Sequence, residues 1–168
     1  MNSLYPDQIY DVELITYAAL LHDVRDHKYP ESITKEDMDK FIYESLGKER
    51  GDLVNLIIEN VSFSKEDKLR KAKNGQTISD EVPTDLHPYL IALRDADRLE
   101  AIGQEGIRRC QVFTETHGGK VPEDVVSHCH EKLLRLYNEH FIKTEEGRRL
   151  AIPLHEEIVQ YVKVNESH

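Results

Sequence analysis

The chain has 168 residues, 39% of them hydrophobic, which is enough for one domain with its own core and no disulfide or metal staples. Its formal net charge of −10 at pH 7 argues against a surface for nucleic-acid polymers, because such surfaces are usually broadly basic. The sequence has no apolar run near the ~20 residues of a membrane span, no signal peptide and only two cysteines, so we expect a cytoplasmic protein without a membrane partner.

The first predicted helix covers Tyr10–Asp23, where apolar residues recur at helical spacing on nearly every side. We therefore expect this helix to be central in the fold. It ends by presenting His22 and Asp23 side by side, and imidazole with carboxylate suits Mn, Fe or Zn and, less well, Mg. The alternative is that these two residues are only the polar end of a buried helix.

Two further helices are predicted by the same spacing. An amphipathic helix runs from Thr34 as N-cap to Gly47, and a more apolar helix begins at Asp52. The latter leads into the segment SFSK, whose hydroxyls and Lys65 could hold phosphate oxygens. An equally good interpretation is that Ser62 or the second serine only caps the next helix.

A polar stretch, Asn74–Asp85, predicts the longest loop, and loops of this length are often lids or mobile rims. The helix that follows contains both Asp95 and Asp97. Residues two apart on a helix point about 200° away from each other. At most one of these two carboxylates therefore belongs with the histidine–aspartate pair of the first helix.

Two arginines accompany these carboxylates. Arg94 and Arg98 are four residues apart and lie on one stripe of the helix, beside Asp97. This position would let Arg98 meet a phosphate while Asp97 met a metal. A surface ion pair of Arg98 with Asp95 or Glu100 is the competing interpretation.

The C-terminal part of the chain predicts helices without further chemistry. His128 and His130 are two apart and diverge on a helix, within an apolar stripe that is typical of a core. The last helix runs from Thr144 to about Val164, and Pro153 is expected to kink it. No segment shows the alternation of a strand, so the predicted fold class is all-α.

Several segments of the chain occur in an order typical of one superfamily. They are LLHDVRDHKY, VSFSK, DADRLEAIGQEGI, HCHEKLLRLYNEH and GRRLA. With these motifs the chain resembles the HD-domain phosphohydrolases, and in particular a branch of small single-domain members, from about Val12 to Val162. A His-Asp pair alone is a weak signal, whereas DADRLEAIG behind it is specific. The resemblance implies one HD-type helical bundle over residues 1–168.

The superfamily binds one divalent metal through an early His, the His-Asp pair and a late Asp. The resemblance therefore implies that His22, Asp23 and Asp97 bind Mn, Fe, Mg or Zn. No His precedes His22, so either the chain begins downstream of the early ligand or the site lacks that ligand. A second departure is Val61, which stands where this branch usually has His.

The activity that the resemblance implies is metal-dependent hydrolysis of a small phosphorylated molecule, most simply a nucleotide, as a pyrophosphohydrolase or phosphatase. The cation would activate water and neutralise a phosphoryl oxygen. Asp95 would orient a ligand histidine. The alternative is a degenerate HD fold that binds a nucleotide or a protein without turnover, which the missing His and Val61 favour. The expected catalytic residues are Asp26, Lys28 and Arg98, and the expected substrate-binding residues are Lys65, Arg94 and Arg98.

Overall fold

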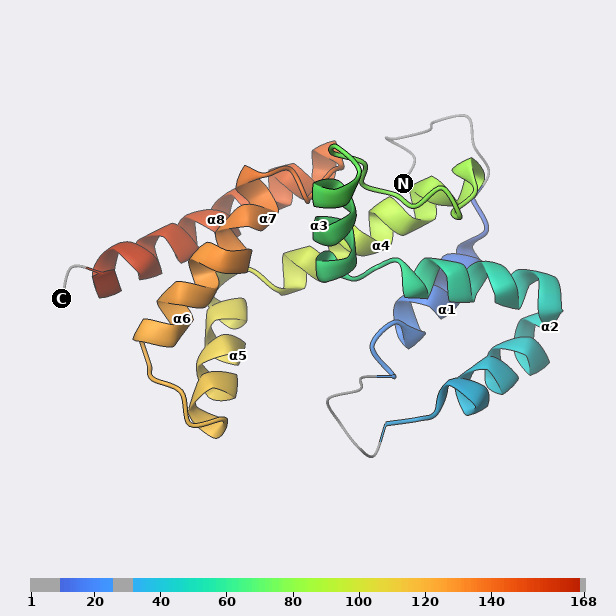
Figure 1. Cartoon of the computed structure of the whole chain (residues 1–168), viewed down its shortest axis with the longest axis horizontal. Coiled ribbons are helices and arrows are strands. Elements are labelled where there is room, and N and C mark those ends of the chain that lie inside the picture. Colours follow the sequence, from blue (N-terminus) through green and yellow to red (C-terminus); the bar gives the residue numbers. More distant parts are fainter. Residues whose placement is uncertain (1–9, 26–31, 167–168) are drawn as a thin grey trace. The chain divides into compact units, whose positions relative to one another are not determined.

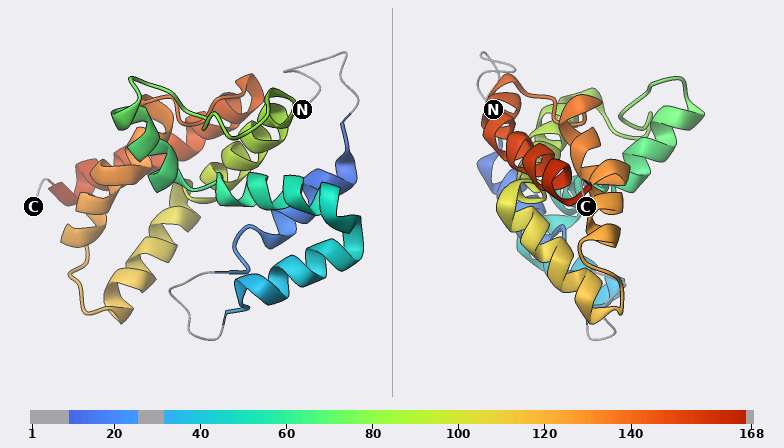
Figure 2. Two further views of the ribbon diagram at one scale, coloured as in Figure 1. Left: turned by 45° about the vertical axis from the view of Figure 1, so that its right-hand side comes forward. Right: turned by 90° about the vertical axis from the view of Figure 1, so that its left-hand side faces the viewer.

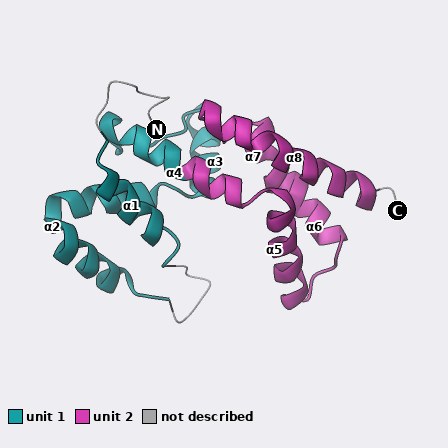
Figure 3. Ribbon diagram, turned by 180° about the vertical axis from the view of Figure 1, so that it is seen from behind, with its two compact units in different colours: residues 1–93 teal, residues 94–168 magenta. Residues whose placement is uncertain are grey.

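A computed structural model of the chain describes residues 10–25 and 32–166. Within these ranges every regular element is a helix, which confirms the all-α prediction (Figure 1). The chain divides into two compact units, residues 1–93 and 94–168, and the boundary lies inside helix α4 (His87–Glu100) (Figure 3). No helix in the described ranges is long and apolar enough to cross a membrane.

The first unit is built on a bent helix. Besides the first part of α4, it contains α1 (Val12–Leu21), α2 (Lys35–Glu59), α3 (Phe63–Ala72) and the short 3-10 helix η1 (Thr84–Leu86). Thr34 caps α2 by accepting a hydrogen bond from the N–H of Asp37, as predicted. At Gly47 the backbone takes φ 76° and ψ 167°, a conformation that glycine adopts without strain. The two arms of α2 therefore fold back on each other at this point (Figure 2), which confirms the predicted break.

Both arms of α2 pack around one core. Its buried residues come from α1, from each arm of α2 and from α4, and include Leu14, Ala18, Met38, Ile42, Val54, Ile57, Leu90 and Leu93. In α1 only Leu14 and Ala18 are buried, whereas Val12 and Leu20 are 69% and 71% exposed. The expectation that this helix is central was wrong, because a ten-residue helix that packs on α2 buries one face only.

The loop before η1 is anchored to this core. Ile78 packs against the buried residues and Val82 is itself buried. The side-chain nitrogen of Gln76 donates to the carbonyl oxygen of Ile78 at 2.8 Å and to Asp80 Oδ1 at 2.7 Å. These contacts do not favour the interpretation of residues 74–85 as a lid.

The second unit is organised around its last helix. It contains the rest of α4, α5 (Gly103–Thr116), α6 (Glu123–His128), the π-helical segment η2 (Cys129–Leu133), α7 (Leu134–Asn138) and α8 (Glu145–Glu166). Helices α5, α6 and α7 all contact α8 (Figure 1). Pro153 lies inside α8 and is exposed, and the helix continues past it to Glu166. The buried residues of the unit include Ile107, Val125, Cys129, Leu136, Phe141, Ile142, Ala151, Ile158 and Val162.

Candidate metal centre

The backbone of α1 orients the His22 side chain. His22 is the C-cap of the helix, and its Nδ1 atom lies 2.8 Å from the carbonyl oxygen of Ala19. A carbonyl oxygen only accepts hydrogen bonds, so a neutral ring in this position carries its proton on Nδ1. The Nε2 atom then keeps its lone pair. A backbone carbonyl on one ring nitrogen is one of the common partners that hold a metal-binding histidine in the correct tautomer.

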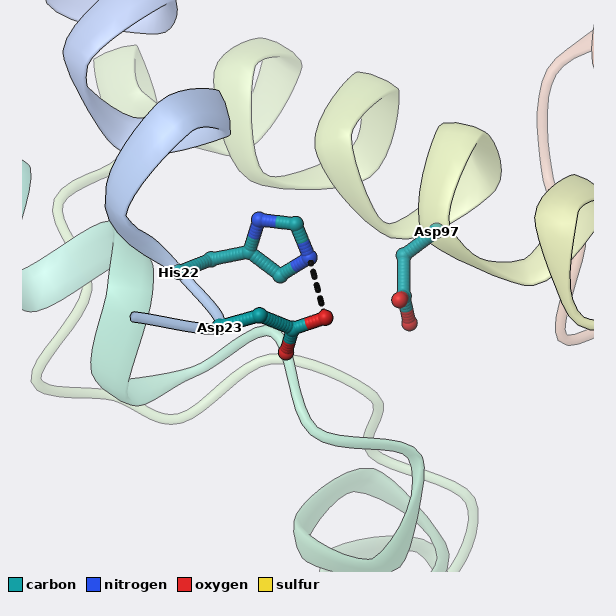
Figure 4. Close-up of side chains that lie close together, drawn as sticks. All are labelled: His22, Asp23 and Asp97. Carbon is teal, nitrogen blue, oxygen red and sulfur yellow. Dashed lines mark ion pairs between the residues drawn. The ribbon is translucent and has the colours of Figure 1, made fainter. Parts of the chain in front are cut away.

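Asp23 follows directly and lies beside the same ring. Its Oδ2 atom is 3.5 Å from His22 Nε2, the ring nitrogen that does not face Ala19 (Figure 4). The side chain of His22 is 17% exposed, whereas that of Asp23 is 82% exposed. One ligand candidate is therefore held firmly and the other can adjust its position.

Asp97 completes a group of three. It lies on α4, one helical turn after the core residue Leu93, and is half-buried. One ligand atom from each of His22, Asp23 and Asp97 lies within 4.8 Å of the other two (Figure 4). Among the residues that the structure describes, no other group of His, Cys, Asp or Glu meets this condition.

The donor set of this group fits a divalent cation. It offers one imidazole nitrogen and two carboxylates, a combination that suits Mn, Fe or Zn. Two atoms that each lie about 2.1 Å from one ion are at most about 4.2 Å apart. The three ligand atoms, which lie within 4.8 Å of one another, therefore need to move only slightly closer together to bind one ion. The exposed side chain of Asp23 can make this movement. Metal binding itself stays a prediction.

Asp95 has a different role from the one expected. Its two carboxylate oxygens accept hydrogen bonds from the backbone N–H groups of Lys143, at 2.8 Å, and Thr144, at 2.7 Å. The residue is 3% exposed. The expectation that Asp95 orients a ligand histidine is not supported, because both of its oxygens are used by the backbone that precedes α8.

Arg98 is a buried residue rather than a surface one. It is 1% exposed, and its Nη1 atom donates to the carbonyl oxygen of Phe141 at 2.5 Å. The guanidinium carbon lies 5.6 Å from the centroid of the Phe141 ring. Any ion pair of Arg98 would therefore be buried and not on the surface as considered. Arg94 is also buried, at 3% exposure. The phosphate roles of both arginines stay predictions.

The SFSK segment acts as a helix start. The hydroxyl of Ser62 accepts a hydrogen bond from the N–H of Lys65, which confirms the capping interpretation. The Lys65 ammonium donates to the carbonyl oxygen of Glu59 at 3.0 Å, and its contact with a substrate stays a prediction. Val61 is 4% exposed and belongs to the core of the first unit. The predicted catalytic residues Asp26 and Lys28 lie outside the described residues.

Sequence reasoning missed two groups that position the site residues. One is the carbonyl oxygen of Ala19, which contacts His22 Nδ1. Because this oxygen is a backbone group, the only sequence signal for the contact is that His22 lies at the end of a helix. The other is the segment from Phe141 to Thr144, which binds the residues on either side of Asp97. No signal near the aspartate in the sequence indicates this segment.

Comparison with known proteins finds similar chains but no matching family model. The sequence is 34% identical over 159 residues to the uncharacterized protein YpgQ of Bacillus subtilis, covering 91% of this chain and 71% of that protein. A crystal structure of selenomethionine YpgQ has a TM-score of 0.71 at 29% identity, and the match covers 94% of this chain and 77% of that chain. A crystal structure of YpgQ in complex with ADP has a TM-score of 0.66 at 28% identity, covering 94% and 76%. A Lactobacillus plantarum protein shares the fold, with a TM-score of 0.70 at 22% identity over 99% of this chain and 79% of that chain.

Proposed function

The chain belongs to the family of Bacillus subtilis YpgQ, and we propose that it is a metal-dependent phosphohydrolase of the HD type that acts on a nucleotide. The observation that carries this proposal is the convergence of His22, Asp23 and Asp97 within 4.8 Å. The motif order described above supports the HD assignment. The complex of YpgQ with ADP supports a nucleotide as the ligand.

Each of the three residues has a distinct task in this proposal. His22 binds the cation through Nε2, while its Nδ1–H donates to the carbonyl oxygen of Ala19 and prevents the ring from turning. Asp97 offers its carboxylate from a helix, which limits its freedom. Asp23 is exposed and can follow the ion or accept a proton from water.

The cation would supply the electrophilic chemistry, because a bound divalent ion lowers the pKa of water and neutralises charge on a phosphoryl oxygen. The protein must still attract a polyanion despite its net charge of −10. Lys65, which is exposed at the start of α3, is the described cation that we assign to the substrate phosphates. Arg94 and Arg98 are buried, so in this proposal they support the site from within the fold.

A second candidate function is nucleotide binding without turnover. It is favoured by Val61, which packs in the core where the HD branch usually has a histidine. A site with three protein ligands holds a cation less firmly than one with four. The two functions differ in turnover, and a direct assay separates them.

The test uses the full chain with added MnCl2. Binding of Mn²⁺ is measured by the loss of the free-ion electron paramagnetic resonance signal, and release of phosphate and pyrophosphate is measured over nucleoside mono-, di- and triphosphates. We expect Mn²⁺-dependent turnover that Asp97→Asn abolishes. Asp85→Asn is the matched control, because Asp85 is an exposed aspartate outside the group of three. Binding of Mn²⁺ and ADP without turnover would favour the binding function, and absence of both would refute the proposal.

A further inference from the structure

The residues on either side of Asp97 attach α4 to one short segment of the chain. Asp95 accepts hydrogen bonds from the backbone of Lys143 and Thr144, at 2.8 and 2.7 Å. Arg98 donates to the carbonyl oxygen of Phe141 at 2.5 Å. Asp95 and Arg98 are 3% and 1% exposed, so water does not compete with these charge-assisted bonds.

The first turn of α8 packs closely against the Asp95 carboxylate. The hydroxyl of Thr144 accepts a hydrogen bond from the N–H of Gly147 at 2.8 Å, and Gly147 is buried. A Cβ atom at position 147 would lie 2.6 Å from Asp95 Oδ2 and 2.7 Å from Thr144 Oγ1. The close approach therefore requires glycine. The carboxylate also lies at the N-terminal end of α8, where the helix dipole favours negative charge.

The position of the Asp97 carboxylate depends on the rotation of α4 about its axis. A side-chain tip on a helix is about 5 Å from the helix axis, so a rotation of α4 by about 10° moves that carboxylate by about 1 Å. Errors of about 1 Å at a reacting centre can reduce rates by about a hundredfold. The bonds of Asp95 and Arg98 flank Asp97 and oppose such a rotation.

We infer that Asp95 is a positioning residue for the metal centre, and that its hydrogen bond from Thr144 and its close packing against Gly147 set the orientation of Asp97. This inference rests on the proposed function, because it assigns Asp97 to a cation. It adds that the start of α8, which supplies no ligand to the group of three, governs how tightly that cation is held.

The test compares two glycine substitutions in the same unit. Gly147→Ala introduces a Cβ beside Asp95 Oδ2, whereas Gly119→Ala introduces one 2.9 Å from Asp124 Oδ2 and 2.8 Å from Thr114 Cγ2. The steric conflicts are similar, but only the first involves α4. Dissociation constants for Mn²⁺ and midpoints of urea unfolding are measured for both variants, and for Asp95→Asn, which keeps the shape of the side chain and loses its charge.

We expect Gly147→Ala and Asp95→Asn to weaken Mn²⁺ binding by about tenfold or more, the effect typical of residues that orient a ligand. Gly119→Ala should lower the unfolding midpoint and change the affinity by less than about twofold. Unchanged affinity in both Gly147→Ala and Asp95→Asn, or an equal loss in Gly119→Ala, would overturn the inference. If Gly147→Ala does not fold, Asp95→Asn decides. If the wild-type chain does not bind Mn²⁺, the proposed function fails and the inference fails with it.

Discussion

His22 Nδ1 lies 2.8 Å from the carbonyl oxygen of Ala19, three residues earlier in the chain. The ligand histidine of the proposed metal centre is thus oriented by the helix that carries it. The adjacent Asp23 comes from the same helix end. One side of the site is therefore formed by local structure alone, and only Asp97 has to be brought to it from a distant part of the sequence.

Replacement of His22 by Gln should weaken Mn²⁺ binding by at least about tenfold. Loss of a ligand should lower the metal affinity at least as much as loss of a group that orients a ligand. The measurement is a titration of Mn²⁺ followed by electron paramagnetic resonance. His130→Gln is the control, since His130 is exposed and contacts Glu166 at 2.6 Å. Equal affinity of His22→Gln and the wild type would exclude His22 as a ligand.

Replacement of Ser62 by Ala should lower stability without changing nucleotide binding. The hydroxyl accepts a hydrogen bond from the N–H of Lys65 at 3.5 Å. Loss of an N-cap costs about 1 kcal/mol, and this long bond should cost no more than that. Urea unfolding measures the stability and a titration with ADP measures the binding. Ser64→Ala is the control, because Ser64 is an exposed serine of the same segment. Weaker ADP binding by Ser62→Ala at unchanged stability would instead indicate a phosphate contact.

The stability of the second unit should decrease in mild acid. Burial lowers the pKa of His155, and burial together with Lys132 lowers the pKa of His128, both from 6.5. The folded state therefore binds fewer protons than the unfolded state below about pH 6.5. The contribution of these two histidines to the free energy of unfolding is fully present above that pH. It is lost as the pH falls through their lowered pKa values.

Urea unfolding midpoints at about pH 7.5 and about pH 5.5 measure this loss. The variant His155→Phe keeps a ring next to Tyr137, whose centroid lies 4.8 Å from that of His155. It should show a smaller decrease between the two pH values than the wild type. A decrease of the same size in both proteins would mean that His155 does not contribute.

Cys129 should be inert in the folded protein. It is fully buried, and burial raises the pKa of its thiol to about 11. At pH 8 only about one thousandth of such a thiol is in the reactive thiolate form. In the variant Cys110→Ser, a thiol-specific disulfide reagent should therefore label Cys129 only after urea is added. Rapid labelling of the native variant would contradict the burial of this residue.

Interactions between residues close together in the sequence were enough to predict much of the fold. The helical period predicts an all-α protein, and short-range hydrogen bonds explain the cap at Thr34 and the cap at Ser62. Gly47 marks a break because the backbone there needs a positive φ. The adjacency of His22 and Asp23 is itself a sequence fact. These features depend on residues no more than a few positions apart.

The helical period alone left open whether Asp95 or Asp97 belongs with His22 and Asp23. The HD resemblance favoured Asp97, and in the tertiary structure one ligand atom of Asp97 lies within 4.8 Å of one from each of the other two residues. Asp95 bonds to backbone groups 48 and 49 residues away, and Asp97 points in another direction because residues two apart on a helix diverge by about 200°. The burial of Arg98 against Phe141, 43 residues away, could not be predicted from the sequence either. The helical period tells which residues share a face of a helix, but the partner that each face meets is chosen by packing between segments far apart in the chain.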